Sequence, residues 1–195
     1  MKKSLAKVNI ILPGYFNWVG PNKCKASSTV TLIQDEKKNI IIDTGTRNNQ
    51  EKIIKVLAKH KLKSVDIDYV IITHAHTDHV ENLGLFNKAE SLNVFETKKA
   101  DVFKISEEIL NKGEKQLTAN VRLILTPGHT TECLTVLVET EQGSIAVAGD
   151  LFVKKQVEKG IFIEDAKIWQ KSRNKIIKLA DFIIPGHGPM FKVNK

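Results

Sequence analysis

Short apolar runs that end in a polar turn recur along the chain, and this pattern predicts its strands. Five segments share the design: residues 40–45 (IIIDTG), 70–79 (VIITHAHTDH), 123–129 (LILTPGH), 145–150 (IAVAGD) and 182–188 (FIIPGHG). In four of the five, Gly or Pro-Gly marks the place where the strand gives way to a loop. Strands that end this way can bring polar groups from distant parts of the sequence to one rim of a sheet.

Two segments between these strands have helical periodicity instead. Residues 50–61 and 165–180 repeat apolar positions on one side, and Asp165 is a plausible helix cap. Alternating strands and amphipathic helices predict an α/β layered domain, in which helices cover the outer faces of sheets whose inner faces share a core. The pattern alone does not fix the topology.

Length and composition narrow the class of protein. A chain of 195 residues, 27% charged and 42% hydrophobic, suits one globular domain over residues 1–195. Its apolar stretches are strand-sized, so we expect no secretory signal and no membrane association. Cys24 and Cys133 form no C-x-x-C pair, which favours reduced thiols and a cytoplasmic protein. A monomer is the baseline, and a homodimer is an open alternative.

The chain is basic, with a net charge of +8 and a pI near 9.4. A basic field can attract a polyanion such as nucleic acid. However, the charge comes mainly from lysines spread along the chain, and arginine, the better phosphate fork, is rare. A solvated surface is therefore favoured, with nucleic acid as the alternative.

Four side chains able to bind a metal crowd into His74-Ala75-His76-Thr77-Asp78-His79. A chain of this composition should contain H-x-H-x-D-H by chance at roughly 10⁻⁴. His129, Asp150 and His187 lie at other strand ends, which gives enough ligands for two metal ions. Imidazole and carboxylate suit zinc first, with iron or manganese as alternatives, and the absence of nearby thiolates argues against a structural zinc finger.

This motif, followed by separate His, Asp and His residues, resembles the signature of the metallo-β-lactamase superfamily. The resemblance extends from Ser28 to Gly188 and implies the metallo-β-lactamase fold, a four-layer αβ/βα sandwich. It further implies two metal ligand sets and a supporting aspartate. The first metal would be held by His74, His76 and His129, the second by Asp78, His79 and His187, with Asp150 bridging the pair and Asp43 bracing the histidine loop.

More specific motifs resemble the family of metallo-β-lactamase domain-containing protein 1. They are residues 82–86 (NLGLF), 147–152 (VAGDLF) and 180–189 (ADFIIPGHGP). Members of that family look like nucleases acting on RNA. The pair Thr130-Thr131 after Pro127-Gly128-His129 also resembles the hydroxyacylglutathione hydrolase (glyoxalase II) branch and the small thioesterases and lactonases.

Metal chemistry predicts hydrolysis more firmly than it predicts a substrate. Metal binding lowers the pKa of water from 15.7 to about 7, and a hydroxide bridging two ions could attack phosphorus or a carbonyl carbon. We expect a dinuclear metallo-hydrolase in which Asp78 is catalytic and orients this hydroxide. Phosphodiester cleavage of RNA is placed slightly ahead of thioester, lactone or glyoxalase II-like ester hydrolysis. An iron-dependent sulfur dioxygenase and a non-catalytic metal-binding protein are further alternatives.

Two other segments carry open expectations. Residues 13–21 concentrate aromatic side chains among turn formers, and they suit either a mobile flap that stacks on a substrate or a loop pinned to the core. The lysine-rich tail, residues 192–195, is expected to be exposed to solvent.

Overall fold

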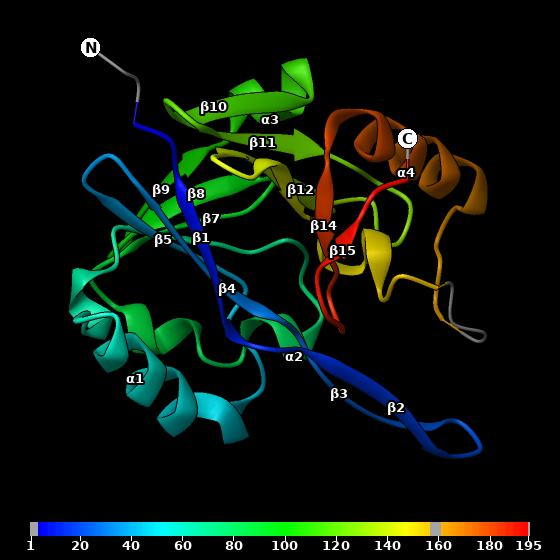
Figure 1. The fold of residues 1–195 in the computed structure, drawn as a ribbon, viewed down its shortest axis with the longest axis horizontal. Coiled ribbons are helices and arrows are strands. Elements are labelled where there is room, and N and C mark those ends of the chain that lie inside the picture. The colour runs from blue at the N-terminus through cyan, green and yellow to red at the C-terminus, as the bar shows by residue number, and fades with distance from the viewer. Residues whose placement is uncertain (1–3, 157–160, 195) are drawn as a thin grey trace.

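The computed structural model describes residues 4–156 and 161–194 of the chain. Within these residues the strands form two large sheets, and a separate two-stranded hairpin projects from the body of the molecule (Figure 1). The first sheet has the order β1-β4-β5-β6-β7-β8-β9, and the second has the order β10-β11-β12-β13-β14-β15. β2 and β3 form the hairpin.

The two sheets take their strands from successive parts of the chain. The first sheet contains β1 (Lys7–Leu12), β4 (Val30–Asp35), β5 (Lys38–Ile42), β6 (Tyr69–Ile71), β7 (Glu90–Leu92), β8 (Glu96–Lys99) and β9 (Val102–Ile105). The second contains β10 (Glu114–Thr118), β11 (Val121–Leu125), β12 (Leu134–Thr140), β13 (Gly143–Val147), β14 (Phe182–Ile184) and β15 (Phe191–Lys192). The hairpin consists of β2 (Tyr15–Gly20) and β3 (Lys23–Ser27).

Helices connect and cover these strands. The α-helices are α1 (Gln50–Lys59), α2 (Thr77–Val80), α3 (Glu107–Lys112) and α4 (Ala166–Leu179). Short 3₁₀ turns are η1 (Arg47–Asn49), η2 (Ser64–Asp66), η3 (Leu83–Phe86) and η4 (Gly149–Phe152). The two helices expected from periodicity are confirmed as α1 and α4, and Asp165 caps α4 by accepting hydrogen bonds from the backbone N–H groups of Lys167 and Ile168 at 2.9 Å.

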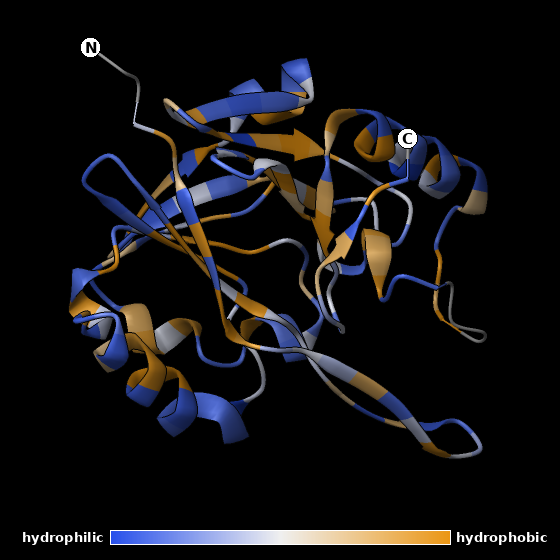
Figure 2. Cartoon of the chain, in the orientation of Figure 1, coloured by the Kyte–Doolittle hydropathy of each residue, from blue (hydrophilic) through white to orange (hydrophobic). Residues whose placement is uncertain are grey.

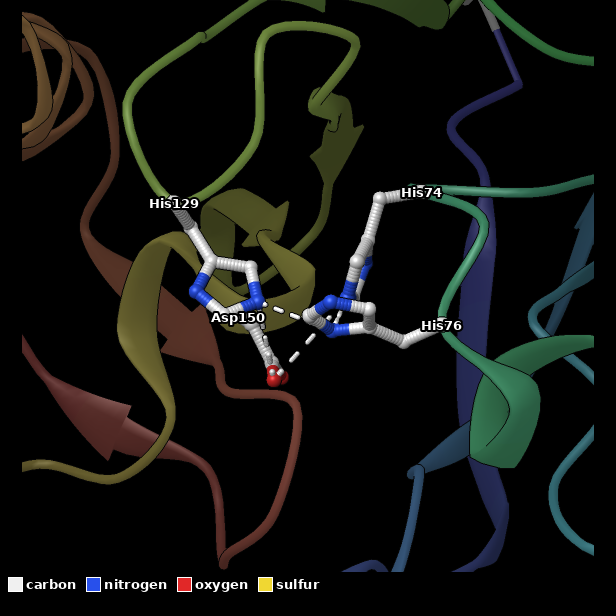
Figure 3. Close-up of side chains that lie close together, drawn as sticks. All are labelled: His74, His76, His129 and Asp150. Carbon is white, nitrogen blue, oxygen red and sulfur yellow. Dashed lines mark hydrogen bonds and ion pairs between the residues drawn. The ribbon is translucent and has the colours of Figure 1, made fainter. Parts of the chain in front are cut away.

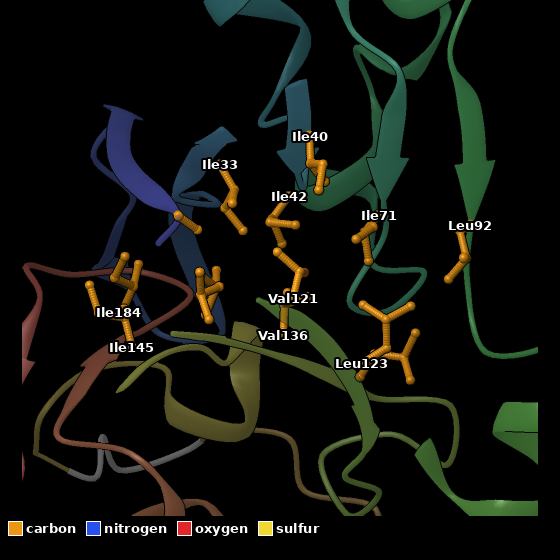
Figure 4. Packing of buried hydrophobic residues seen from close by; sticks show 14 of the residues in the cluster. Ile33, Ile40, Ile42, Ile71, Leu92, Val121, Leu123, Val136, Ile145 and Ile184 are labelled. Carbon is orange, nitrogen blue, oxygen red and sulfur yellow. The ribbon is translucent and has the colours of Figure 1, made fainter. Parts of the chain in front are cut away.

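The alternation of side chains along each strand builds three apolar layers. In β5, Ile40 and Ile42 face the core between the sheets, whereas Ile41 faces the opposite way, where α1 packs. In β13, Ile145 likewise faces the inner core, and Ala146 faces the side covered by α4. Figure 4 shows the inner layer, where residues of both sheets interdigitate.

Helix, sheet, sheet and helix therefore stack as four layers, as the resemblance implied. α1 carries hydrophobic residues on one side and hydrophilic residues on the other, as a helix covering a sheet must (Figure 2). This confirms the predicted αβ/βα sandwich, the metallo-β-lactamase fold.

The expectation of an exposed C-terminal tail is wrong in part. Lys192 and Asn194 are exposed as expected, but Lys192 belongs to β15, which pairs with β14, and Val193 is buried against the layer beneath α4. Lys195 lies outside the described residues. The apolar Phe191 and Val193 on either side of Lys192 give this strand its buried face, so the lysines of the tail are a poor guide to its position.

Candidate metal centre

Strand ends at one rim of both sheets supply the residues of the predicted metal cluster. β5 and β6 run parallel in the first sheet, and β13 and β14 run parallel in the second, so the carboxyl ends of each pair meet at the same edge. The loop after β6 carries His74, His76, Asp78 and His79, whereas His129, Asp150 and His187 follow β11, β13 and β14.

The structure brings all seven of these residues together in two adjacent groups. His74, His76, His129 and Asp150 form the first group, and Asp78, His79 and His187 form the second. Within each group, one ligand atom from every residue lies within 4.8 Å of the others.

Imidazole nitrogens and one carboxylate oxygen face each other in the first group. Figure 3 shows His74, His76, His129 and Asp150 pointing toward a common point. His76 Nδ1 lies 2.9 Å from His74 Nε2 and 3.1 Å from His129 Nε2. Asp150 Oδ2 lies 3.5 Å from His129 Nε2. Three nitrogens and one oxygen at this spacing are a donor set that zinc accepts in its usual tetrahedral coordination.

Asp150 also reaches the second group through its other oxygen. Asp150 Oδ1 lies 3.1 Å from His187 Nε2 and 3.4 Å from His79 Nε2. Asp78 Oδ2 is 3.5 Å from His187 Nε2. The carboxylate of Asp150 therefore stands between the groups with one oxygen directed to each.

The second group, together with the Asp150 oxygen that faces it, contains buried polar atoms that the protein itself leaves unsatisfied. Among the described residues, Asp78 Oδ2, His79 Nε2 and Asp150 Oδ1 are buried and have no hydrogen-bond partner. Burying such atoms without a partner costs free energy, and the cost is large for a carboxylate. A divalent cation would satisfy all three at once, so the residues present fit a metal ion in this group.

Hydrogen-bond partners of the Nδ1 atoms orient two of the histidines for metal binding through Nε2. Asp43 Oδ2 lies 2.8 Å from His79 Nδ1, and the carbonyl oxygens of Tyr15 and Ser27 lie 3.1 and 3.0 Å from His187 Nδ1. An imidazole that donates from Nδ1 to an oxygen keeps the lone pair of Nε2 free for a metal.

Asp43 itself is held firmly. Its Oδ1 accepts a hydrogen bond from the backbone N–H of Thr73 at 2.8 Å, and its Oδ2 accepts one from the Thr73 hydroxyl at 2.8 Å. Its backbone has a φ of +56°, an unusual conformation that Asp tolerates better than most residues. Asp43 thus braces the start of the histidine loop, as the resemblance implied, and makes no contact of its own with the first group.

The charges at the site act on each other strongly. Burial lowers the pKa of His74 well below its usual value, and the neighbouring His79 adds to the effect. Burial alone would raise the pKa of Asp150, but His187 and His79 outweigh it and hold that pKa well below its usual value. A neutral imidazole and an ionised carboxylate are the forms in which these side chains bind metals.

The pKa values of two other histidines are raised instead of lowered. Burial would lower the pKa of His79, but Asp43 and Asp150 raise it well above its usual value. Burial opposes protonation of His187 as well, and Asp150 again raises its pKa. Metal binding at the second group should therefore release protons from these two rings.

Some supporting residues were missed in the sequence. Gly149 has a φ of +49°, and a Cβ there would meet Thr73 Oγ1 at 2.5 Å, so this glycine lets the Asp150 turn approach the histidine loop. The carbonyl oxygen of Phe162 lies 2.8 Å from His129 Nδ1. The Val147-Ala148-Gly149-Asp150 motif could have pointed to the glycine. The sequence gives no comparable signal for a backbone carbonyl.

The aromatic segment contains β2 of the hairpin, and its contact with His187 supports the interpretation of a pinned segment, whereas mobility and stacking on a substrate stay predictions. Its base is fixed against the site, because the rings of Phe16 and His187 lie 5.9 Å apart. Trp18 and Val19, farther out, are 47% and 54% exposed. A cavity of about 410 Å³ opens beside His187 between this base and Lys154 and Lys155.

Cys133 lies near the site but takes no part in it. The side chain is buried, and burial raises the pKa of its thiol to about 12. A thiol that stays protonated is a poor ligand and a poor nucleophile. Its sulfur accepts a hydrogen bond from the backbone N–H of Thr130, a contact that shapes the loop after His129.

Comparison with known proteins identifies the family. The sequence profile of the metallo-beta-lactamase superfamily matches residues 26–187, which is most of the chain. The chain belongs to the metallo-β-lactamase superfamily. Membership in the metallo-β-lactamase superfamily, together with the His and Asp cluster, makes the protein a metallo-hydrolase.

Two relatives within the metallo-β-lactamase superfamily carry the same name. The chain is 34% identical to the metallo-beta-lactamase domain-containing protein 1 of Xenopus laevis, over 96% of this chain and 82% of that protein. Identity to the Mus musculus protein of the same name is 32%, over 85% of this chain and 65% of that protein. The chain therefore spans just under two thirds of the length of the mouse relative.

Solved structures agree on the metallo-β-lactamase fold. A Thermotoga maritima protein assigned to the metallo-β-lactamases superposes with a TM-score of 0.73 at 20% identity, covering 96% of this chain and 99% of that one. An N-acyl homoserine lactone hydrolase with its product at the catalytic metal centre has a TM-score of 0.68 at 18% identity, covering 96% and 94%. At these identities the likeness shows the fold alone. The described residues contain no helix long and apolar enough to span a membrane.

Proposed function

We propose that this metallo-hydrolase is dinuclear and cleaves phosphodiester bonds, with RNA as the substrate. The position of Asp150 carries the proposal of two metals, because its two oxygens face two separate groups of ligands. We propose zinc first for both groups, with iron or manganese as alternatives. Divalent ions held in this way would supply Lewis acidity and a nucleophile at neutral pH.

Asp78 has the position of a catalytic residue. Its side chain is 20% exposed, whereas that of Asp150 is 9% exposed, so Asp78 lies closer to incoming solvent. A carboxylate at the edge of the ligand group can accept a hydrogen bond from an attacking water and align it. We therefore propose that Asp78 combines ligation with orientation of the nucleophile.

Charge and shape beside the site support an anionic substrate. The cavity beside His187 is bordered by Lys154 and Lys155 on one side and by Tyr15 and Phe16 on the other. The backbone N–H of His187 donates to the carbonyl of Val153 at 2.8 Å, which fixes the start of the lysine segment next to the metal ligand. Lysines can contact phosphate oxygens, and aromatic rings can stack on nucleobases.

Ester hydrolysis is the second candidate, and a specific observation favours it. The same cavity is lined by Tyr15, Phe16 and Pro189, which suit the apolar part of a lactone or thioester. The solved lactone hydrolase shows that this fold can host such chemistry at a metal centre. A homodimer, a cytoplasmic location and a single domain over residues 1–195 stay predictions from the sequence.

Elemental analysis followed by a substrate panel tests the proposal. Purified protein should contain close to two metal equivalents and should cleave single-stranded RNA and bis-p-nitrophenyl phosphate faster than a lactone or a thioester. RNA cleavage should weaken steeply with added salt, because bound lysines displace counterions from phosphates. Turnover of esters without any phosphodiester cleavage would replace this proposal by the second candidate.

Variants of two aspartates separate catalysis from folding. Asp78→Ala should lower kcat by about 10²-fold or more while the protein stays folded. Asp101→Ala, at an exposed turn away from both metal groups, is the matched control and should keep full activity. Unchanged turnover in Asp78→Ala would remove this residue from the mechanism.

A further inference from the structure

A large groove runs along α4 on the outer side of the second sheet. Its volume is about 1090 Å³, and it lies between α4 and residues of β10 and β11. The floor includes Leu125, Pro127 and Leu179, and Ile168 on α4 is 43% exposed beside it. Neither the metal centre nor the cavity beside His187 includes this surface, so the proposed function does not yet explain it.

The charge on the α4 side of this groove has one sign. Lys167, Lys171, Lys175 and Lys178 of α4 all line it and are exposed. Their spacing of four, four and three residues keeps them within roughly 80° of one another around the helix axis. The helix sequence AKIWQKSRNKIIKL contains no acidic residue.

Within the described residues, none of these four lysines forms a salt bridge. Glu114 is the acidic residue lining the groove, and its Oε2 accepts a hydrogen bond from Arg122 Nη1 at 3.3 Å. The remaining cation of α4, Arg173, is directed elsewhere: its guanidinium stacks over the rings of Phe152 and Trp169 and donates to the carbonyl of Leu151.

The groove reaches the loop that carries His129, because Pro127 of that loop lines it. Ser172 Oγ donates to the carbonyl of Pro127 at 2.7 Å, and the backbone N–H of Asp165 donates to the carbonyl of Gly128 at 3.0 Å. His129 follows directly. From Lys167 to Lys178 the row of lysines is about 16 Å long, at 1.5 Å per residue, and its first half lies beside this loop.

We propose that this α4 groove binds the phosphate backbone of single-stranded RNA beyond the scissile bond. The inference rests on the proposed phosphodiesterase function and adds a second contact region to it. A row of cations on a rigid helix matches a regularly spaced row of phosphates. The apolar floor and the aliphatic stems of the lysines can cover sugars and the faces of bases.

Helix α1 provides a matched comparison within the same molecule. Its Lys52, Lys55 and Lys59 are also exposed, but Lys55 Nζ lies 3.7 Å from Glu51 Oε2 and the helix covers the other sheet. Two triple variants, K171Q/K175Q/K178Q on α4 and K52Q/K55Q/K59Q on α1, therefore remove the same charge from two different surfaces.

Steady-state kinetics of the metal-loaded enzyme test the groove with substrates of different length. The α4 variant should raise KM for poly(U) at least about tenfold and leave kcat unchanged, and each lost phosphate contact should reduce the salt slope by about 0.7. Its kinetics with the dinucleotide UpU and with bis-p-nitrophenyl phosphate should equal those of the wild type. The α1 variant should match the wild type with all three substrates.

Equal effects of the two triple variants on poly(U), or an equal effect of the α4 variant on UpU, would overturn the proposal. Circular dichroism and Tm check that both variants fold. If the wild type cleaves no phosphodiester, the proposed function fails, and fluorescence anisotropy of labelled poly(U) with a chelator present still tests the groove. Binding that is lost in the α4 variant alone supports it, whereas binding of poly-glutamate in place of poly(U) assigns the groove to an acidic protein and overturns it.

Discussion

The histidine loop of the first sheet and the strand ends of the second sheet present imidazoles to the same centre, but they orient them by different means. In the first region, His79 is held by the carboxylate of Asp43 at 2.8 Å. In the second region, His129 and His187 are held by backbone carbonyls, those of Phe162, Tyr15 and Ser27. One region depends on a side chain, and the other depends on the path of the main chain.

This difference predicts how substitutions in each region change metal affinity and stability. A single substitution can remove a carboxylate and leave the backbone in place, so the first region should lose metal affinity without losing stability. A carbonyl cannot be removed by substitution, so the orientation of His129 and His187 should be damaged by changes that displace their loops. Loss of stability and loss of metal should then occur together.

Asp150 lies between the two ligand groups, and its removal should have the largest effect on metal binding and on kcat/KM. Asp150→Ala takes away an oxygen from each ligand group, so kcat/KM should fall by about 10³-fold or more and less than one metal equivalent should remain bound. Elemental analysis and steady-state kinetics measure both. A variant with full metal content and turnover would show that Asp150 does not join the groups.

Gly128 tests the dependence of the second region on its main chain. Its φ is +133°, and a Cβ there would overlap the backbone of Trp169. Gly128→Ala should lower the free energy of unfolding by about 3 kcal/mol and weaken metal binding as the His129 loop moves. Urea unfolding and metal titration are the measurements.

Gly84→Ala is the control for that substitution, because a Cβ at Gly84 would meet nothing within 4 Å. Its free energy of unfolding should stay within about 0.5 kcal/mol of the wild type. Equal stability of the two alanine variants would contradict the role given to the main chain of the second region.

The local part of this site could be predicted from the sequence. Four residues able to bind a metal within six positions form a pattern too improbable to be accidental, and the short segment after β6 keeps them together. The layers could be predicted too, because strands such as β5 are apolar on both faces and the two amphipathic helices need sheets to cover.

The strand-end pattern singled out His129, Asp150 and His187, but their division into two ligand sets needed the family resemblance. The pairing of β11 through β14 brings these three segments to one edge of the second sheet, and the packing of the two sheets places that edge beside the first region. The carbonyl oxygens that orient these histidines could not be predicted from the sequence. Every residue has a carbonyl, and the residue type does not show which carbonyl accepts a hydrogen bond from a histidine. The α4 lysines were visible, but their groove depends on how the helix sits on the sheet.

Asp43→Asn tests the first region by changing one atom. The amide can accept a hydrogen bond through one oxygen only, so the contacts with Thr73 and His79 cannot all persist. Metal affinity should fall about 10- to 100-fold, as found when such supporting partners are lost. The unfolding midpoint of the metal-free protein should change little. A large drop in this midpoint would contradict the claim that the first region can lose metal affinity without losing stability.

Asp68 offers the smallest and most distant test of the first region. It accepts hydrogen bonds from Lys38 Nζ at 2.8 Å and from the backbone N–H of Asn39 at 2.9 Å, at the start of β6 and away from the metal ligands. Burial would raise its pKa, but the contacts with Lys38 and Asn39 outweigh burial and lower it.

A lowered pKa means that the folded state favours the Asp68 carboxylate, so its stabilising contribution is present above the unfolded pKa near 3.8 and is lost as the pH falls through the folded value. Asp68→Asn should lower Tm by about 2 °C at neutral pH, and the difference should vanish in acid. Metal affinity should stay at the wild-type level. A loss of metal as large as that of Asp43→Asn would mean that the histidine loop depends on the whole strand beneath it and not on the Asp43 contact.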